Sequence, residues 1–172
     1  MSTTSLVSVV IATYNMGKFL SESINSVLNQ TYANIEVIVV DDGSTDGTNE
    51  VMKPYLGDSR IKYIIQDNTG QASAKNRGIR ESQGEFVAFL DADDMWVPEK
   101  LALQIPVFAK SQNVGVVYAR VSYIDEMGST IRIADNELFR GRVSSDLFIR
   151  NFIGFGTSVV KRECLTRLGG FK

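Results

Sequence analysis

The feature that most constrains the fold of this 172-residue chain is an alternation of short apolar runs with longer helical stretches. Four runs have the length and apolar character of buried strands, and they are residues 6–12, which are rich in β-branched side chains, 35–40, 61–65 and 86–90. Stretches typical of helices lie between them, at residues 19–28, 51–56 and 70–82. The alternation predicts an α/β fold: a Rossmann-like, doubly wound, mainly parallel sheet flanked by helices in a single domain.

The second half of the sequence predicts a less regular structure. We expect a helix over residues 98–110 with Pro98 in its first turn, where proline is well tolerated. Residues 125–142 are polar and irregular, and Gly128 and Gly141 mark turns within them. The remaining expected elements are a strand over 114–124, antiparallel or at an edge, a short helix over 145–150 and a strand over 157–161.

Composition excludes several kinds of chemistry. The sequence has no histidine, which excludes Ser-His-Asp catalysis, histidine-ligated metals and histidine general bases. Cys164 is the only cysteine, which excludes an internal disulfide and a cysteine-based zinc site. The formal charge of −2 provides no general attraction for nucleic acid, so we expect none as a partner. No apolar run approaches the roughly 20 residues of a membrane span, and no signal-peptide pattern is present, so we expect a cytoplasmic protein.

Three of the predicted strands end in polar clusters. The clusters are Thr13-Tyr14-Asn15, Asp41-Asp42-Gly43-Ser44 and Asp91-Ala92-Asp93-Asp94. Because parallel strands joined by helical crossovers end at the same edge of a sheet, the clusters are expected to converge where α/β proteins bind ligands. Crowded carboxylates repel one another and need a cation or a shared proton. A divalent cation, Mg²⁺ or Mn²⁺, that holds a phosphorylated ligand is the economical explanation.

Each cluster taken alone also has a purely structural interpretation. Asp-Asp-Gly-Ser is a good turn or helix-cap sequence, because Asp and Ser side chains accept hydrogen bonds from free backbone N–H groups. Lys75 and Arg77 fit the solvated face of a helix, or else one of them reaches the phosphates or base of a nucleotide. The placement of all three clusters after strands is much harder to explain by capping.

Together these residues resemble the family 2 inverting glycosyltransferases, which have the GT-A fold. The matching pieces follow one another in the family's order at residues 9–15, 39–46, 68–70, 74–79, 89–94 and 168–171. Each piece alone is a weak signal, whereas the ordered set is specific. The resemblance implies metal-dependent transfer of a sugar, with inversion, from a nucleotide-diphosphate sugar to an acceptor. The donor is most often a UDP-sugar, the metal is Mn²⁺ or Mg²⁺, and the acceptor is a glycan, a lipid-linked glycan or a protein.

The resemblance also implies roles for individual residues. The expected donor-binding set is Thr13, Tyr14, Asn15, Asp42, Lys75, Asp91 and Ala92. Within it, Thr13, Tyr14 and Asp42 match positions that hold uracil and ribose, and Asp91 matches the acid near the ribose. Asp93 matches the metal ligand, while Asp94 fits either a group behind the metal site or a helix cap. Lys75 departs from the arginine usual in the family, which keeps the charge but loses the planar, forked donor pattern.

A second departure concerns the general base. Direct displacement needs a group that takes the proton of the acceptor hydroxyl. In the family this group is an Asp or Glu after the Gly-Gly-Phe turn, and this sequence ends at Lys172, just after Phe171. The acids of the second half fit a solvated surface better than the role of base, and they are Asp125, Glu126, Asp135, Asp146 and Glu163.

We therefore expect residues 1–172 to be the donor-binding part of a glycosyltransferase catalytic domain, with the general base beyond Lys172. The full-length protein is expected to lie peripherally at the inner face of the membrane. The alternative is a non-catalytic nucleotide-binding or regulatory module.

Overall fold

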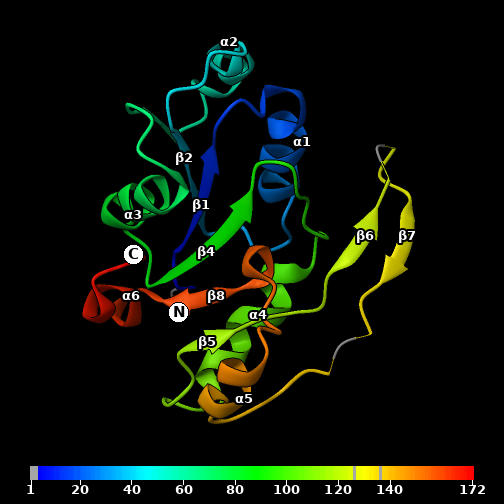
Figure 1. Ribbon diagram of the computed structural model, residues 1–172. Helices are drawn as coiled ribbons and strands as arrows, with labels where there is room; N and C mark the ends of the chain where they lie inside the picture. The colour runs from blue at the N-terminus through cyan, green and yellow to red at the C-terminus, as the bar shows by residue number, and fades with distance from the viewer. Residues whose placement is uncertain (1–3, 126, 136) are drawn as a thin grey trace.

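A six-stranded sheet forms the centre of the computed structural model, which describes residues 4–125, 127–135 and 137–172 (Figure 1). The strands in chain order are β1 (Val7–Thr13), β2 (Ile35–Asp41), β3 (Ile61–Ile65), β4 (Phe86–Asp91), β5 (Val116–Val117) and β8 (Val159–Lys161). They lie side by side in the order β3-β2-β1-β4-β8-β5. The first four run parallel, β8 runs antiparallel to β4, and β5 runs antiparallel to β8. The expected mainly parallel sheet is confirmed.

Helices cover both faces of this sheet (Figure 1). The α-helices of the described chain are α1 (Gly17–Leu28), α2 (Thr48–Met52), α3 (Gln71–Glu81), α4 (Lys100–Ala109), α5 (Ser144–Ile149) and α6 (Arg162–Leu168), and α5 buries none of its residues. Val9 and Ile11 of β1 share one apolar core with Ile24 of α1 and Leu101 of α4. Val10, between them, packs on the other face, in a cluster that includes residues of β4 and α6. Alternate residues of one buried strand thus supply two cores, as a doubly wound sheet requires.

Helix α3 lies unusually close to β1, and Gly78 explains why. A Cβ atom at this position would lie 2.2 Å from Cγ1 of Val10, far inside a normal contact. Glycine removes that obstacle and lets the helix backbone approach the strand. The close approach holds α3 against β1.

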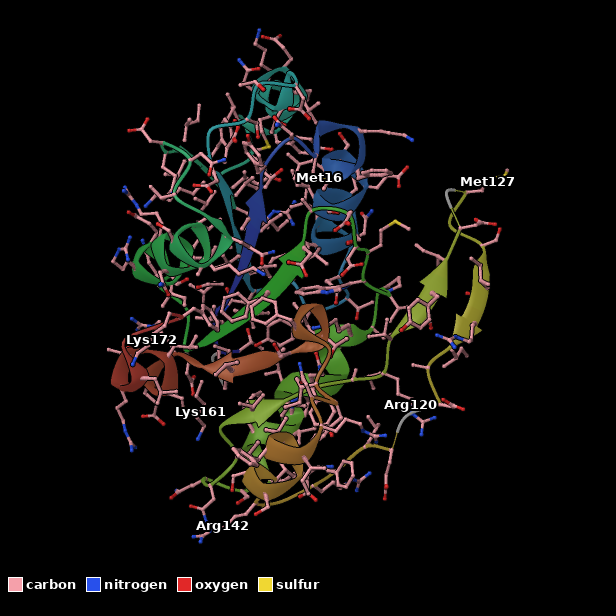
Figure 2. The ribbon with its side chains drawn as sticks, in the orientation of Figure 1. Met16, Arg120, Met127, Arg142, Lys161 and Lys172 are labelled. Atoms are coloured by element: carbon pink, nitrogen blue, oxygen red, sulfur yellow. The ribbon has the colours of Figure 1, made fainter. Side chains whose placement is uncertain are left out.

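The second half of the chain differs from the sequence prediction in four places. The strand expected over 114–124 is antiparallel and at the edge of the sheet as β5, but its length is wrong: β5 contains two residues, and β6 (Ser122–Ile124) leaves the main sheet to pair with β7 (Thr130–Ile133). The stretch expected to be irregular therefore contains β7, and Met127, 90% exposed, lies at the end of a hairpin that projects from the body (Figure 2). Helix α4 begins at Lys100, two residues after Pro98, and α6 was not predicted.

The two glycine turns expected in the second half of the chain are confirmed. Gly128 and Gly141 lie at turns with positive φ angles of 78° and 82°. Glu126, one of the acids considered as a base, falls outside the described residues. Within the described part of the chain, no helix is both long and apolar enough to cross a membrane.

Candidate functional site

The three polar clusters meet at one edge of the sheet. The strand register pairs Thr13 with Asp41 and Ala12 with Asp91, which brings the ends of β1, β2 and β4 together. An open pocket of about 510 Å³ lies at this edge. The residues that line it are Ala12, Thr13, Tyr14, Met16, Asp42, Asn68, Gly70, Gln71, Ala74, Asp91, Ala92 and Asp93. The structure therefore confirms that the three clusters converge at this edge of the sheet.

Thr13 ends β1 inside this pocket. It is only 2% exposed, and its Oγ1 is the buried side-chain polar atom that has no hydrogen-bond partner among the described residues. A buried hydroxyl without a partner loses free energy relative to its hydrated state, so such groups are rare and call for an explanation. A ligand in the pocket that bonds to this hydroxyl would supply one.

The two residues after Thr13 differ in their surroundings. The Tyr14 side chain is exposed at the pocket. Asn15 instead joins the loop after β1 to the loop after β2, with its backbone in the left-handed region at φ 53°. Its N–H donates to Ser44 Oγ at 2.9 Å, and its Oδ1 accepts from the Thr45 N–H at 2.7 Å. Asn15 is thus placed beside the pocket in a structural contact, while Tyr14 is placed in it.

Asp42 lies at the base of the pocket and is 3% exposed. One oxygen accepts from Gln66 Nε2 at 2.7 Å and the Thr69 N–H at 3.0 Å, and the other accepts from the Gly70 N–H at 2.8 Å. Burial by itself would raise the pKa of this carboxyl, but the hydrogen bonds outweigh it and lower the pKa. Asp42 therefore stays ionised and fixed.

Asp41, its neighbour, has a structural role. Its carboxylate accepts from the Ser44 N–H at 2.8 Å and from the Tyr63 hydroxyl at 2.7 Å. The turn interpretation of the Asp-Asp-Gly-Ser sequence is therefore right for the first aspartate. No pattern in the sequence indicates Gln66 as a partner of Asp42, and Asn68-Thr69-Gly70 is predicted only as a piece of the family pattern.

The acidic loop after β4 is held in place by α1. Ser23 Oγ donates to the carbonyl oxygens of Ala92 and Asp94 at 2.8 and 2.7 Å. Burial, and then the nearby charges of Asp91 and Asp93, raise the pKa of the Asp94 carboxyl. Asp94 is not a cap of α4, since that helix begins at Lys100 after Glu99.

Asp93 is the carboxylate best suited to a metal ion. Its side chain is exposed at the pocket, whereas Asp91 is paired with Lys75 Nζ at 2.9 Å. Among the described residues, no group of three or more acidic, cysteine or histidine side chains could hold a metal unaided. Mg²⁺ and similar cations commonly bind through one or two carboxylates together with substrate phosphates and water. The residues present fit a metal that is shared with a bound diphosphate.

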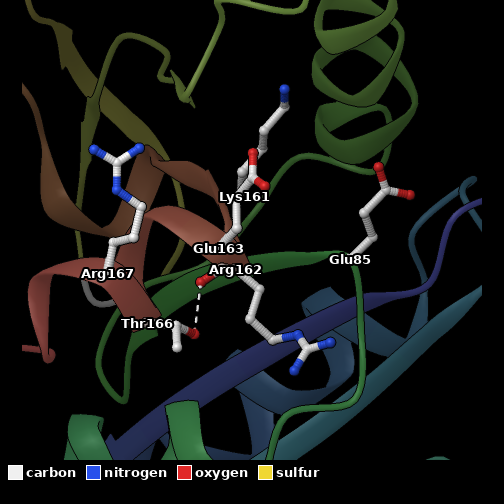
Figure 3. Close-up of a pocket in the computed structure, with 6 residues that line it drawn as sticks. All are labelled: Glu85, Lys161, Arg162, Glu163, Thr166 and Arg167. Carbon is white, nitrogen blue, oxygen red and sulfur yellow. Dashed lines mark hydrogen bonds between the residues drawn. The ribbon is translucent and has the colours of Figure 1, made fainter.

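A second pocket, of about 530 Å³, lies at the other end of β4 (Figure 3). It is lined by Glu85, Lys161, Arg162, Glu163, Thr166 and Arg167. Arg162 Nε donates to the Gly84 carbonyl at 2.7 Å, and Lys161 Nζ donates to the Gln112 carbonyl at 2.9 Å. Its charges are mixed, and these two cations diverge toward backbone partners. The first pocket, at the ends of β1, β2 and β4, is therefore the better candidate site.

Comparison with known proteins identifies the family. The model of glycosyl transferase family 2 matches residues 8–168. A glycosyltransferase of Nostoc sp. (strain PCC 7120) is 44% identical over 133 residues, which are 76% of this chain and 41% of the relative. The Escherichia coli UDP-Glc:alpha-D-GlcNAc-diphosphoundecaprenol beta-1,3-glucosyltransferase WfgD is 40% identical over 121 residues, 70% of this chain and 47% of the relative. The chain thus spans about two fifths to half the length of these relatives.

Solved structures confirm the GT-A-like fold. The mannosyltransferase PcManGT of Pyrobaculum calidifontis, in complex with GDP-Man and Mn²⁺, has a TM-score of 0.75 at 25% identity, covering 99% of this chain and 48% of that protein. TarS of S. aureus, in complex with UDP-GlcNAc, has a TM-score of 0.77 at 24% identity, covering 96% and 48%. Because the family match extends over nearly the whole chain, this chain belongs to glycosyl transferase family 2.

Proposed function

We propose that this chain forms the donor-binding part of a glycosyltransferase that takes a nucleotide-diphosphate sugar together with Mn²⁺ or Mg²⁺. The observation that carries the proposal is the pocket at the ends of β1, β2 and β4, where the unpartnered hydroxyl of Thr13 lies together with Asp42 and Asp93. These groups come from three separate strand ends. Packing of the sheet alone requires none of them at this edge.

The nucleoside is proposed to bind between Thr13, Tyr14 and Asp42. Asp42 already accepts three hydrogen bonds, and a carboxylate offers about four acceptor positions, so one remains for a base N–H or a ribose hydroxyl. Thr13 Oγ1 can donate to a base carbonyl or accept from an N–H. The exposed ring of Tyr14 offers an apolar face to the base. Asp91, with the backbone of Ala92, is proposed to contact the ribose.

The diphosphate is proposed to lie beside Asp93. When bound, Mn²⁺ or Mg²⁺ would neutralise the charge that develops on the departing diphosphate. Asp93 would hold the metal through its exposed carboxylate. The mannosyltransferase with GDP-Man and Mn²⁺, 25% identical to this chain, supports a metal-bound donor.

The donor base and the acceptor class are proposed from the relatives. The Escherichia coli relative is named for UDP-Glc as donor and a diphosphoundecaprenol-linked sugar as acceptor, which supports a UDP-sugar and a lipid-linked glycan. GDP is the competing base, because the mannosyltransferase structure contains GDP-Man. Titration of both nucleotides decides between them.

Proton removal from the acceptor is not assigned to this pocket. The carboxylates among its lining residues are Asp42, Asp91 and Asp93, and each already has a proposed role toward the donor or the metal. We therefore propose that residues 1–172 hold the donor but do not complete the transfer efficiently by themselves.

Isothermal titration calorimetry tests the donor proposal. UDP and GDP are titrated into the 172-residue chain with and without Mn²⁺, and UDP is expected to bind more tightly with the metal. Asp93→Ala should remove the metal-dependent part of the affinity without changing the circular dichroism spectrum. Glu22→Ala, which removes an exposed carboxylate of α1, is the matched control. Absence of binding by either nucleotide, with or without metal, would refute the proposal.

A further inference from the structure

Lys75 is the buried cation next to the pocket. Only 8% of its side chain is exposed, compared with 30% for its partner Asp91. Its Nζ lies 2.9 Å from Asp91 Oδ1 and 3.9 Å from the centroid of the Phe155 ring. The ammonium is therefore held between a carboxylate and an aromatic face. Asp91 lines the pocket, so the effect of Lys75 reaches the pocket through that carboxylate.

Phe155 is itself fixed from two sides. Its ring centroid lies 4.8 Å from that of Phe89 on β4 and 5.5 Å from that of Phe171. Phe171 is anchored to α3, because its N–H donates to Asn76 Oδ1 and its carbonyl accepts from Asn76 Nδ2, both at 2.8 Å. The Gly-Gly-Phe turn thus supports Phe155, and Phe155 supports Lys75. Lys75 and Asn76, which are neighbours on α3, therefore belong to one connected set of contacts.

A shift of Lys75 toward a phosphate would be unfavourable. The ammonium would lose its contact with the Phe155 ring and its charge-assisted hydrogen bond to Asp91. Removing one partner from a largely buried ion pair also leaves the other charge uncompensated, which is strongly destabilising. Asp91 would then lie beside Asp93 and Asp94 without a cation from the protein.

We propose that Lys75 is a positioning residue, which orients the Asp91 carboxylate toward the ribose and does not bind the diphosphate. The side-chain hydrogen bonds to the Asp91 carboxylate found among the described residues end on Oδ1, from Lys75 and, at 3.4 Å, from Gln71. Oδ2 is then the oxygen presented to a ribose hydroxyl. This inference rests on the proposed function and assigns Lys75 to the nucleoside side of the same site.

Calorimetry with uridine and UDP separates the two possible roles, because uridine lacks the phosphates. Lys75→Met should weaken both ligands by the same factor, about tenfold, because a misoriented Asp91 loses its charge-assisted hydrogen bond to the ribose. Lys75→Met combined with Asp91→Asn should be no weaker than Asp91→Asn alone, within about twofold, because the two side chains act as one unit. Arg80→Met removes an exposed cation from the same helix and is the control, with no expected change.

Two results would overturn the inference. One is a loss confined to UDP in Lys75→Met, which would indicate a phosphate contact, and the other is an additive loss in the double variant. If Lys75→Met does not fold, Phe155→Leu replaces it: the ring beneath the ammonium is removed, and uridine and UDP should again weaken equally. A wild-type chain that binds neither ligand would refute the proposed function itself, before any variant is compared.

Discussion

Lys100, which follows the acidic loop in the chain, offers a measurable test of how much burial of a charge destabilises this fold. It is the first residue of α4 and is buried, with its Nζ 3.8 Å from the centroid of the Trp96 ring and 2.8 Å from Gln104 Oε1. Neither neighbour carries a negative charge. Burial lowers the pKa of this ammonium from 10.5 to about 7. Replacement by methionine keeps the length of the side chain and removes the charge.

The direction of the pH dependence follows from proton binding. Between about pH 7 and pH 10.5 the unfolded chain carries a protonated Lys100, whereas the folded chain increasingly does not. Unfolding therefore takes up a proton, and the free energy of unfolding rises with pH through this window. Below pH 7 both states are protonated, and the cost of burying the charge is present in full.

The magnitude combines opposing effects. The pKa difference corresponds to about 5 kcal/mol at low pH, which is an upper limit because neighbouring groups relax around a buried charge. Methionine would also leave Gln104 Oε1 without its donor, at a cost of about 1–2 kcal/mol, and would lose a cation–π contact of about 1 kcal/mol. We therefore expect Lys100→Met to be about 1–3 kcal/mol more stable than wild type at pH 6. The two should become equal near about pH 9–10, where the remaining cost of burying the charge has fallen to the size of the lost contacts.

Urea unfolding at pH 6, 7.5 and 9.5 measures these differences. Lys110→Met is the control, since Lys110 is exposed at the other end of the same helix and its loss should change stability by less than about 0.5 kcal/mol. A Lys100→Met variant that is less stable than wild type at pH 6 would refute the reasoning. A difference that does not change with pH would refute it equally.

Three predictions concern the pocket directly. Thr13→Val should leave the free energy of unfolding unchanged or raise it by up to about 1 kcal/mol, since the lost hydroxyl has no described partner, while calorimetry records weaker UDP binding. Asp42→Ala should weaken uridine as well as UDP, and a loss confined to UDP would place Asp42 on the phosphate side instead. The wild-type chain supplied with donor, metal and a lipid-linked acceptor should release little nucleotide beyond background hydrolysis, and robust transfer would contradict the proposed absence of a base from this chain.

The central sheet was predictable because its strands combine two local signals. The strands β1, β2 and β4 are mostly apolar, β1 and β2 are rich in β-branched residues, and each strand ends in a polar residue. Parallel geometry then brings those polar residues to one edge without any knowledge of side-chain contacts. The same two signals are missing after α4, where β6 and β7 are short and exposed, so their pairing could not be predicted.

Contacts between distant loops were beyond prediction for a different reason. Gln66 and Thr69 donate to Asp42 from a loop that follows the next strand, and Asn76 bonds to Phe171, 95 residues away. Neither pairing leaves a periodic pattern in the sequence.

The orientation of helix α4 was also not predictable. The helix is apolar on several sides, and the structure buries Lys100 while Leu103 is exposed. An apolar pattern without a polar face does not specify which side of a helix packs inward.

Turn formation and ligand binding need not be alternatives for a cluster, because we assign them to neighbouring residues of the same cluster. Asp41 holds the turn after β2 through Ser44 and Tyr63, and the next residue, Asp42, lies in the pocket. After β4 the backbone of Asp94 is bonded to Ser23, and the preceding residue, Asp93, is exposed at the pocket. A side chain next to an anchored residue has fewer conformations to lose when a ligand binds, so less of the binding free energy is spent on ordering it. Loosening the anchors should therefore weaken donor binding even though they do not touch the donor.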